Sequence, residues 1–201
     1  MNFKVIKFPG EKTKFIAPTW DEMNQLAFEL SQKIIQDKKK FDRIVTLAKG
    51  GWPMTRSMVD FLGVDKVASI GVKFYSRGIY KKLDQPKIYQ DIPEPIKGER
   101  ILLFDDVADS GGSLEFVYKY LTDLKPQSII TATLLYKPWS TFKPDYYGAE
   151  TDAWIHFPYD AVQDGVKLLA KKWQENGLGQ TEVVKRLRQL GTNPEWIKAY
   201  L

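Results

Sequence analysis

Continuous apolar runs and breaks rich in Gly and Pro alternate along the middle of the chain. Helices are predicted from Pro53 to about Phe61 and from Gly112 to about Asp123. Unbroken apolar runs are typical of strands buried on both faces of a sheet, and they occur at residues 43–48, 67–75, 101–104 and 128–136. Because strands and helices alternate along the chain, we predict an α/β fold with a central, mostly parallel sheet flanked by helices.

The two ends of the chain carry weaker patterns. Residues 2–8 alternate roughly and predict an edge strand. Thr19 followed by Glu22 forms a capping box, and apolar residues then recur at helical spacing. A last short strand is predicted at 152–157. Helical periodicity after about residue 161 predicts two or three helices packed onto the core.

The segment from Ser76 to Pro95 follows neither pattern. It is polar, Gly and Pro punctuate it, and Lys, Tyr and Asp are scattered through it. We therefore expect a long loop, with or without short strands. Long loops within compact domains are often functional lids, so this segment is a candidate lid.

Composition narrows the possible chemistry. The chain has 201 residues, enough for one domain with a full core, and no cysteine, which excludes disulfides and thiolate metal sites or nucleophiles. No apolar run is long enough for a transmembrane helix, and the N-terminus lacks the pattern of a signal peptide, so we expect a cytoplasmic protein. The net charge of +5 is spread along the chain and suits either nucleic acid or a small polyanionic substrate.

The stretch ILLFDDVADSGGSLEFV, residues 101–117, concentrates the candidate chemistry. Its apolar run leads Asp105 and Asp106 to the edge of the sheet where open parallel sheets bind ligands. The turn at 110–113 then enters a helix. Glycines let a backbone approach an anion closely, and the free N–H groups of a helix start can donate to phosphate oxygens. The stretch therefore predicts a phosphate site beside two carboxylates.

Carboxylates would repel a bare phosphate, so the acids indicate a second group on the same ligand. Ribose hydroxyls can donate to ionised carboxylates, and Mg²⁺ prefers a few carboxylates together with substrate oxygens. A sugar phosphate meets both needs. An acidic helix start without a ligand is the simpler alternative, but three acids and two glycines within residues 105–113 exceed what capping requires. The spacings of the common nucleotide-binding glycine motifs are absent.

Three segments together resemble one family. FDDVADSGGS, residues 104–113, resembles the phosphoribosyl pyrophosphate (PRPP) signature of type I phosphoribosyltransferases. AKGG, residues 48–51, follows a strand and resembles the pyrophosphate loop of the 6-oxopurine members. Lys137 and DAWIHFPYD at 152–160 resemble their base-binding region, closest to the xanthine-guanine enzymes. The similarity covers residues from about 40 to 160.

The resemblance implies a type I phosphoribosyltransferase fold with a small base-binding hood. One phosphoribosyltransferase domain would span residues 1–160, with a lid loop at about 76–95. Residues 161–201 would form a helical C-terminal extension packed on the core. A homodimer or homotetramer is also expected from the family, with exposed aromatic residues such as Trp139 or Trp173 at the interface.

The activity that the resemblance implies is purine salvage. Ribose 5-phosphate would pass from PRPP to hypoxanthine, guanine or xanthine, and pyrophosphate would be released. The lid cations Arg77, Lys81 and Lys82 are candidate phosphate contacts, and a cis peptide bond is expected before Lys49. The residues implied to bind PRPP are Lys49, Gly50, Gly51, Asp105, Asp106, Asp109, Ser110, Gly111, Gly112 and Ser113.

The resemblance also assigns roles at the purine. Asp109 would be the general base near N7, and Lys137 would donate to O6. Trp154 would stack on the base, whose edge would meet the backbone of Ile155. Mg²⁺ would be the cofactor, with the metal residues Asp106 and Asp160.

Simpler roles stay open for several of these residues. Asp109 could only order its turn, Lys137 could be a solvent lysine at a strand end, and Trp154 could belong to the core. The single histidine, His156, is expected to be packed or on the surface rather than catalytic. Lys49 stands where xanthine-guanine enzymes commonly have Arg, which leaves the preferred oxopurine open.

Two other functions are alternatives to purine salvage. A regulatory protein on the same fold could bind PRPP or RNA without catalysis, and the basic run KRLRQ at 185–189 is the one hint of it, although a solvated helix face is the simpler explanation. Transfer to a pyrimidine or to orotate is disfavoured by the purine-type arrangement of Trp154 and Lys137.

Overall fold

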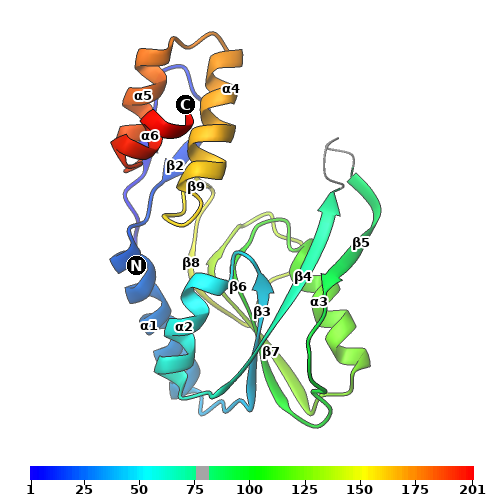
Figure 1. Cartoon of the computed structure of the whole chain (residues 1–201). Coiled ribbons are helices and arrows are strands. Elements are labelled where there is room, and N and C mark those ends of the chain that lie inside the picture. Colours follow the sequence, from blue (N-terminus) through cyan, green and yellow to red (C-terminus); the bar gives the residue numbers. More distant parts are fainter. Residues whose placement is uncertain (76–81) are drawn as a thin grey trace. The chain divides into compact units, whose positions relative to one another are not determined.

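The computed structural model describes residues 1–75 and 82–201, apart from the side chains of residues 74–85 (Figure 1). The chain forms two compact units. One comprises Asn24–Thr151, and we call it the sheet unit. The other joins Met1–Met23 to Asp152–Leu201, and we call it the terminal unit. The division at residue 160 that the family resemblance implies stays a prediction.

The sheet unit has the predicted α/β architecture. Its six-stranded sheet has the order β5-β4-β3-β6-β7-β8, and all neighbours are parallel except β4 and β5. The strands are β3 (Arg43–Ala48), β4 (Lys66–Tyr75), β5 (Lys82–Gln90), β6 (Arg100–Ala108), β7 (Ser128–Tyr136) and β8 (Tyr146–Glu150). The helices that accompany them are α1 (Trp20–Gln36), which begins in the terminal unit, α2 (Trp52–Leu62) and α3 (Gly112–Asp123).

Helices cover both faces of this sheet. On one face, Val45 and Leu103 belong to a buried cluster with Leu114 of α3. On the other, Thr46 accepts a hydrogen bond from the Thr55 hydroxyl of α2 at 2.8 Å. Figure 1 shows α2 and α3 on opposite sides of the strands. Burial on both faces explains why β3, β6 and β7 have continuous apolar sequences.

Local signals mark the helix ends, and the capping box at the start of α1 is as predicted. The Thr19 hydroxyl accepts the backbone N–H of Glu22 at 3.1 Å, and the Glu22 carboxylate accepts the N–H of Thr19 at 2.8 Å, which is a complete capping box. Gly63 follows α2 in the left-handed region, at φ 63°, where glycine costs least. These caps set the limits of the helices that enter and leave the sheet.

The segment expected to be a long loop contains a nine-residue strand, β5, so that expectation was wrong for residues 82–90. β5 lies at the sheet edge and pairs antiparallel with β4 through two irregularities of register. An edge strand needs backbone pairing more than an apolar face and tolerates a proline such as Pro86, so its polar sequence concealed it. The predicted lid cations Arg77 and Lys81, and the side chain of Lys82, lie outside the described residues.

The terminal unit builds its own core from both ends of the chain. Its small sheet has the order β1-β2-β9, formed by β1 (Ile6–Lys7), β2 (Lys14–Ile16) and β9 (Trp154–Ile155). A π-helix, η1 (Ala161–Leu169), and three short helices follow: α4 (Ala170–Glu175), α5 (Gln180–Gln189) and α6 (Pro194–Tyr200). Phe8, Phe15 and Trp173 pack as tilted and edge-on rings within one buried cluster. Trp173 is only 1% exposed, so its expected place at an interface was wrong.

His156 is buried in this unit, as expected for a packed residue. Its Nε2 lies 3.0 Å from the hydroxyl of Thr192, which follows α5. A Cβ on Gly165 would lie 2.3 Å from the His156 ring, so the π-helix can approach the histidine only with glycine at this position. Burial lowers the pKa of His156 to about 4. The ring therefore stays neutral at physiological pH and joins the C-terminal helices to the segment that follows β9.

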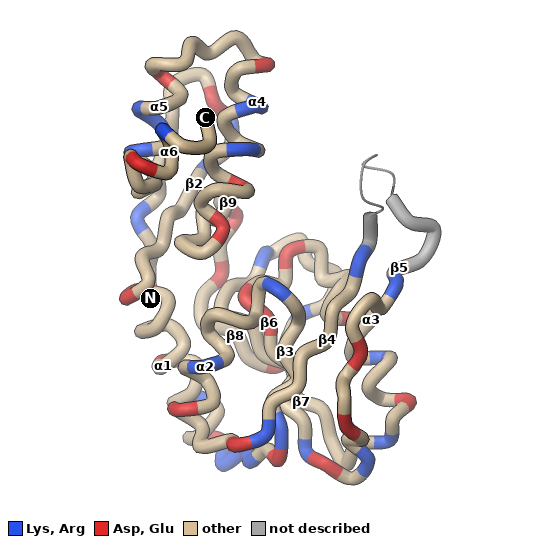
Figure 2. Tube along the Cα trace, in the orientation of Figure 1, with Lys and Arg blue, Asp and Glu red and all other residues tan. Residues whose placement is uncertain are grey.

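Charged residues of both signs are interspersed along the described chain (Figure 2). This distribution matches the expectation that charge is spread along the chain. Among the residues described, no helix combines the length and apolar character that crossing a bilayer requires. A cytoplasmic location stays a prediction.

The buried histidine predicts a specific pH dependence of stability. In the unfolded chain the imidazole takes up a proton near its ordinary pKa of 6.5, whereas in the fold it does so only near 4. Stability from this residue is complete above pH 6.5 and is lost as the pH falls towards 4, by about 2 to 3 kcal/mol at pH 4.5. Urea unfolding followed by tryptophan fluorescence at pH 7.5 and 4.5 should show this loss in the wild type. The loss should be smaller by that amount in His156→Gln, and an equal loss in both proteins would contradict it.

Candidate active site

The predicted acid pair lies at the carboxyl end of β6. The strand continues to Ala108, so Asp105 and Asp106 belong to the strand rather than following it. Asp106 is 6% exposed, and its backbone N–H donates to Oδ1 of Asp105 at 3.0 Å. Burial, and then the charge of Asp106, raise the pKa of Asp105 well above its usual range. Two adjacent carboxylates are thus held where their repulsion is felt strongly.

The predicted pyrophosphate loop packs directly against this pair. It leaves β3, whose register pairs Thr46 with Phe104, the residue before the acids. The peptide bond before Lys49 is cis, as the resemblance implied. A Cβ on Gly50 would lie 2.6 Å from both carboxylate oxygens of Asp106. Crowding by Asp106, rather than an unusual φ, therefore explains the glycine at position 50.

Gly51 is confined in the same way from the sheet side. A Cβ there would lie 2.3 Å from the hydroxyl oxygen of Thr46 and 3.0 Å from the carbonyl oxygen of Leu47. The N–H of Gly51 donates to that carbonyl at 3.0 Å. Lys49, by contrast, is exposed. The two glycines are therefore more than a simple turn, because each brings the backbone close to groups that leave no room for a side chain.

The turn between β6 and α3 has the properties of an anion site. Gly111 has φ 84°, and a Cβ on it would lie 2.5 Å from the backbone nitrogen of Phe142. α3 begins at Gly112 without a side-chain cap. The hydroxyl of Ser110 accepts only a long hydrogen bond, 3.4 Å, from the N–H of Gly112. The first-turn N–H groups thus have no strong side-chain acceptor and can donate to an anion.

One cavity unites these elements. Its volume is about 250 Å³, and it opens at the carboxyl ends of β3 and β6, where the fold rule places ligands. Among the residues predicted to bind PRPP, those that line it are Gly50, Asp105, Asp106, Asp109, Ser110, Gly111 and Ser113. Lys49, Gly51 and Gly112 are their immediate neighbours in the chain.

A loop after β7 closes against the same turn, and we call residues 137–142 the β7 loop. The backbone N–H of Lys137 donates to the carbonyl of Ala108 at 3.1 Å, and that of Thr141 donates to the carbonyl of Ser110 at 3.0 Å. Lys137 is 5% exposed, so it is not the solvent lysine of the simpler interpretation. Lys137, the predicted O6 donor, is therefore hydrogen-bonded through its backbone to the residue before Asp109.

Sequence reasoning missed the involvement of Trp139 in this site. Its indole N–H donates to Oδ1 of Asp109 at 3.1 Å, and the Lys137 ammonium lies 5.2 Å from the centroid of its ring. The only signal was an aromatic residue two positions after the predicted purine lysine. Its expected role at an interface did not suggest a contact with Asp109.

The remaining predicted residues belong to the terminal unit. Trp154 is partly buried, packs against the core of that unit, and has a buried indole nitrogen without a hydrogen-bond partner in the described structure. Ile155 is 7% exposed. Asp160 precedes η1, and its charge adds to burial in raising the pKa of Asp164. Their roles at the purine and metal stay predictions, and residues 1–75 and 82–201 contain no group of three or more potential metal-ligating side chains.

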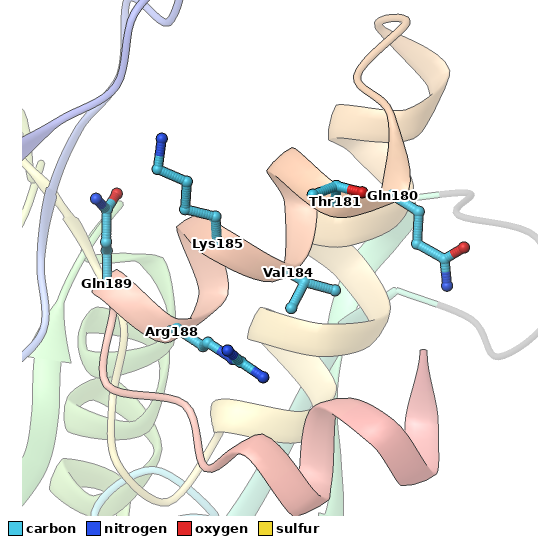
Figure 3. A pocket seen from close by; sticks show the side chains of 6 residues that line it. All are labelled: Gln180, Thr181, Val184, Lys185, Arg188 and Gln189. Atoms are coloured by element: carbon cyan, nitrogen blue, oxygen red, sulfur yellow. The ribbon is translucent and has the colours of Figure 1, made fainter.

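A second hollow, of about 620 Å³, lies on α5 of the terminal unit (Figure 3). Its lining contains two cations and none of the predicted site residues: Gln180, Thr181, Val184, Lys185, Arg188 and Gln189. In the basic run that suggested RNA, Arg186 is buried. Its guanidinium donates to the carbonyl of Pro9 at 2.8 Å and lies over the rings of Phe8 and Trp173. Part of the run is therefore structural.

Comparisons with known proteins find the same family that the sequence motifs resemble. The model of the phosphoribosyl transferase domain family matches residues 19–164. Xanthine-guanine phosphoribosyltransferase of Gluconobacter oxydans is 28% identical over 72% of this chain and 83% of its own. Hypoxanthine-guanine phosphoribosyltransferase of Dictyostelium discoideum is 27% identical over 59% and 69%. The crystal structure of a purine phosphoribosyltransferase from Pyrococcus horikoshii superposes with a TM-score of 0.64 and 33% identity, covering 72% of this chain and 93% of that one.

The crowding at Gly50 predicts a selective loss of ligand binding. In Gly50→Ala the new methyl group displaces the Asp106 carboxylate, so affinity for PRPP should fall about 10- to 100-fold in calorimetry with Mg²⁺ present. Gly179→Ala is the matched control, because its Cβ would meet nothing within 4 Å and its φ is −68°. Unchanged PRPP affinity in Gly50→Ala would refute the role given to this contact.

Proposed function

Because the chain belongs to the phosphoribosyl transferase domain family, we propose that it is a purine salvage enzyme that transfers ribose 5-phosphate from PRPP to a 6-oxopurine. The observation that carries this proposal is the single cavity shared by the acid pair, the Gly50 loop and the turn at 109–113. One ligand with a phosphate, a diol and a second phosphate group matches all three. PRPP is such a molecule.

Each part of the cavity would bind one part of PRPP. The 5′-phosphate would accept hydrogen bonds from the backbone and hydroxyls of residues 110–113. The ribose hydroxyls would donate to Asp105 and Asp106. Pyrophosphate would lie against Lys49 and the backbone of Gly50 and Gly51. The Gly50 contact with Asp106 supports this arrangement, since it brings the two binding segments together.

The purine would be held from the β7 loop. The Lys137 ammonium can only donate hydrogen bonds, so it favours the oxo group of a 6-oxopurine over the amino group of adenine. N9 would attack C1′ of the ribose while the bond from C1′ to pyrophosphate breaks. Asp109 would accept the proton from N7, which becomes acidic as N9 forms its bond. The retained Lys49, Asp109 and Lys137 favour this enzyme over the regulatory alternative.

The acid pair also fits the Mg²⁺ that the family resemblance implies. Burial and mutual repulsion raise the pKa of Asp105, and a divalent cation would offset that repulsion. Asp106 would hold this ion, and Asp160, which belongs to the terminal unit, would bind a second Mg²⁺. When bound, Mg²⁺ supplies positive charge that stabilises the departing pyrophosphate.

A purine panel tests the proposal most simply. With PRPP and Mg²⁺, at least one of hypoxanthine, guanine and xanthine should support pyrophosphate release. The kcat/KM for adenine should be at least about 100-fold below that of the oxopurine that is used, because the adenine amino group cannot accept a hydrogen bond from Lys137. Better use of adenine than of hypoxanthine would contradict the role of Lys137.

Replacing the proposed base tests the chemical step. Asp109→Asn keeps an oxygen that can accept from Trp139 but removes the basic carboxylate. The kcat should fall about 10²- to 10⁴-fold at saturating substrates, with little change in the affinity for PRPP. Full turnover in this variant, measured as nucleotide formed, would show that Asp109 only orders its turn.

A further inference from the structure

Trp139 joins the two groups that the proposed function assigns to the purine. Its side chain is 55% exposed, yet both the N–H and the ring face of its indole contact another residue. At the ring edge, the N–H donates to Oδ1 of Asp109 at 3.1 Å. Above the ring face, the Lys137 ammonium lies 5.2 Å from the centroid, within the range of a cation–π interaction.

The backbone around Trp139 is fixed to the same turn on both sides. Before it, the N–H of Lys137 donates to Ala108. After it, the N–H and the hydroxyl of Thr141 both donate to the carbonyl of Ser110, at 3.0 and 2.9 Å. Three consecutive residues of the turn, 108 to 110, thus each accept a hydrogen bond from the β7 loop. The indole therefore reaches Asp109 from a loop that is hydrogen-bonded to the turn before and after Trp139.

From these contacts we propose that Trp139 is a positioning residue for purine transfer. Its N–H fixes one oxygen of Asp109 and leaves the other directed to the N7 proton. Its ring face orients the Lys137 ammonium towards O6. Because one rigid ring contacts both groups, it sets the distance between the N7 and O6 contacts of the same purine. This inference rests on the proposed function.

Two variants separate the edge of the ring from its face. Trp139→Phe removes the N–H but keeps an aromatic face for Lys137, so kcat should fall about tenfold while the KM for the purine changes less than threefold. Trp139→Leu removes both, so kcat should fall by a similar factor and the purine KM should rise. The KM for PRPP should stay unchanged in both. Trp196→Phe, at a tryptophan of similar exposure in α6, is the matched control and should behave as wild type.

A double-mutant cycle distinguishes positioning of Asp109 from general support of the fold. If the indole acts through the Asp109 carboxylate, Trp139→Phe should lower kcat further by less than twofold in the Asp109→Asn background. A full additional tenfold loss there, or wild-type kcat in Trp139→Phe alone, would overturn the proposal.

An activity-independent readout tests the contact itself. The chain has six tryptophans, and the indole N–H signal that disappears from the ¹⁵N spectrum in Trp139→Phe identifies Trp139. That signal should shift in Asp109→Ala, whereas the signal of Trp196 should not. An unmoved Trp139 signal would overturn the inference even in an active enzyme. A wild-type chain that used no oxopurine, but showed the shift, would contradict the proposed function and leave the contact established.

Discussion

The site depends on the burial of two adjacent carboxylates at the end of a central strand. Burial, and then the charge of Asp106, raise the pKa of Asp105 well above its usual range. Gly50 belongs to the same constraint, because a Cβ there would lie 2.6 Å from both carboxylate oxygens of Asp106, so only glycine leaves room for that carboxylate. A buried carboxylate pair is costly unless hydroxyl donors or a cation contact it, so we expect the strand end to favour a ligand that supplies one of them.

Much of the sheet unit could be predicted from the sequence because its signals are local. β3, α3 and β7 have the predicted limits, since buried apolar runs and flanking glycines or prolines mark them. β5 and β8 were not predicted as strands, because edge strands are held by backbone pairing that leaves no apolar pattern. In the terminal unit, helices after about residue 161 and a short strand within 152–157 were predicted. Its sheet was beyond local reasoning, because it pairs Phe15 with Trp154, far apart in the chain.

The candidate site divides in the same way. The acid pair, the glycine turn and the pyrophosphate loop are contiguous motifs, so their residues could be named before their surroundings were known. The reason for a glycine at position 50 could not be predicted, because the crowding comes from Asp106, which lies on another strand. Trp139 was assigned a different role for the same reason, since its partner Asp109 lies thirty residues earlier and only the packing of the β7 loop joins them. Motifs predicted the proposed ligand, and long-range contacts show which of the candidate residues lie together.

The most direct measurement is a crystal structure of the protein with PRPP and Mg²⁺. The account predicts the 5′-phosphate within the turn at residues 109–113 and the ribose hydroxyls against Asp105 and Asp106. A structure with this cavity empty and PRPP bound elsewhere, or with no PRPP bound at saturating concentration, would contradict it.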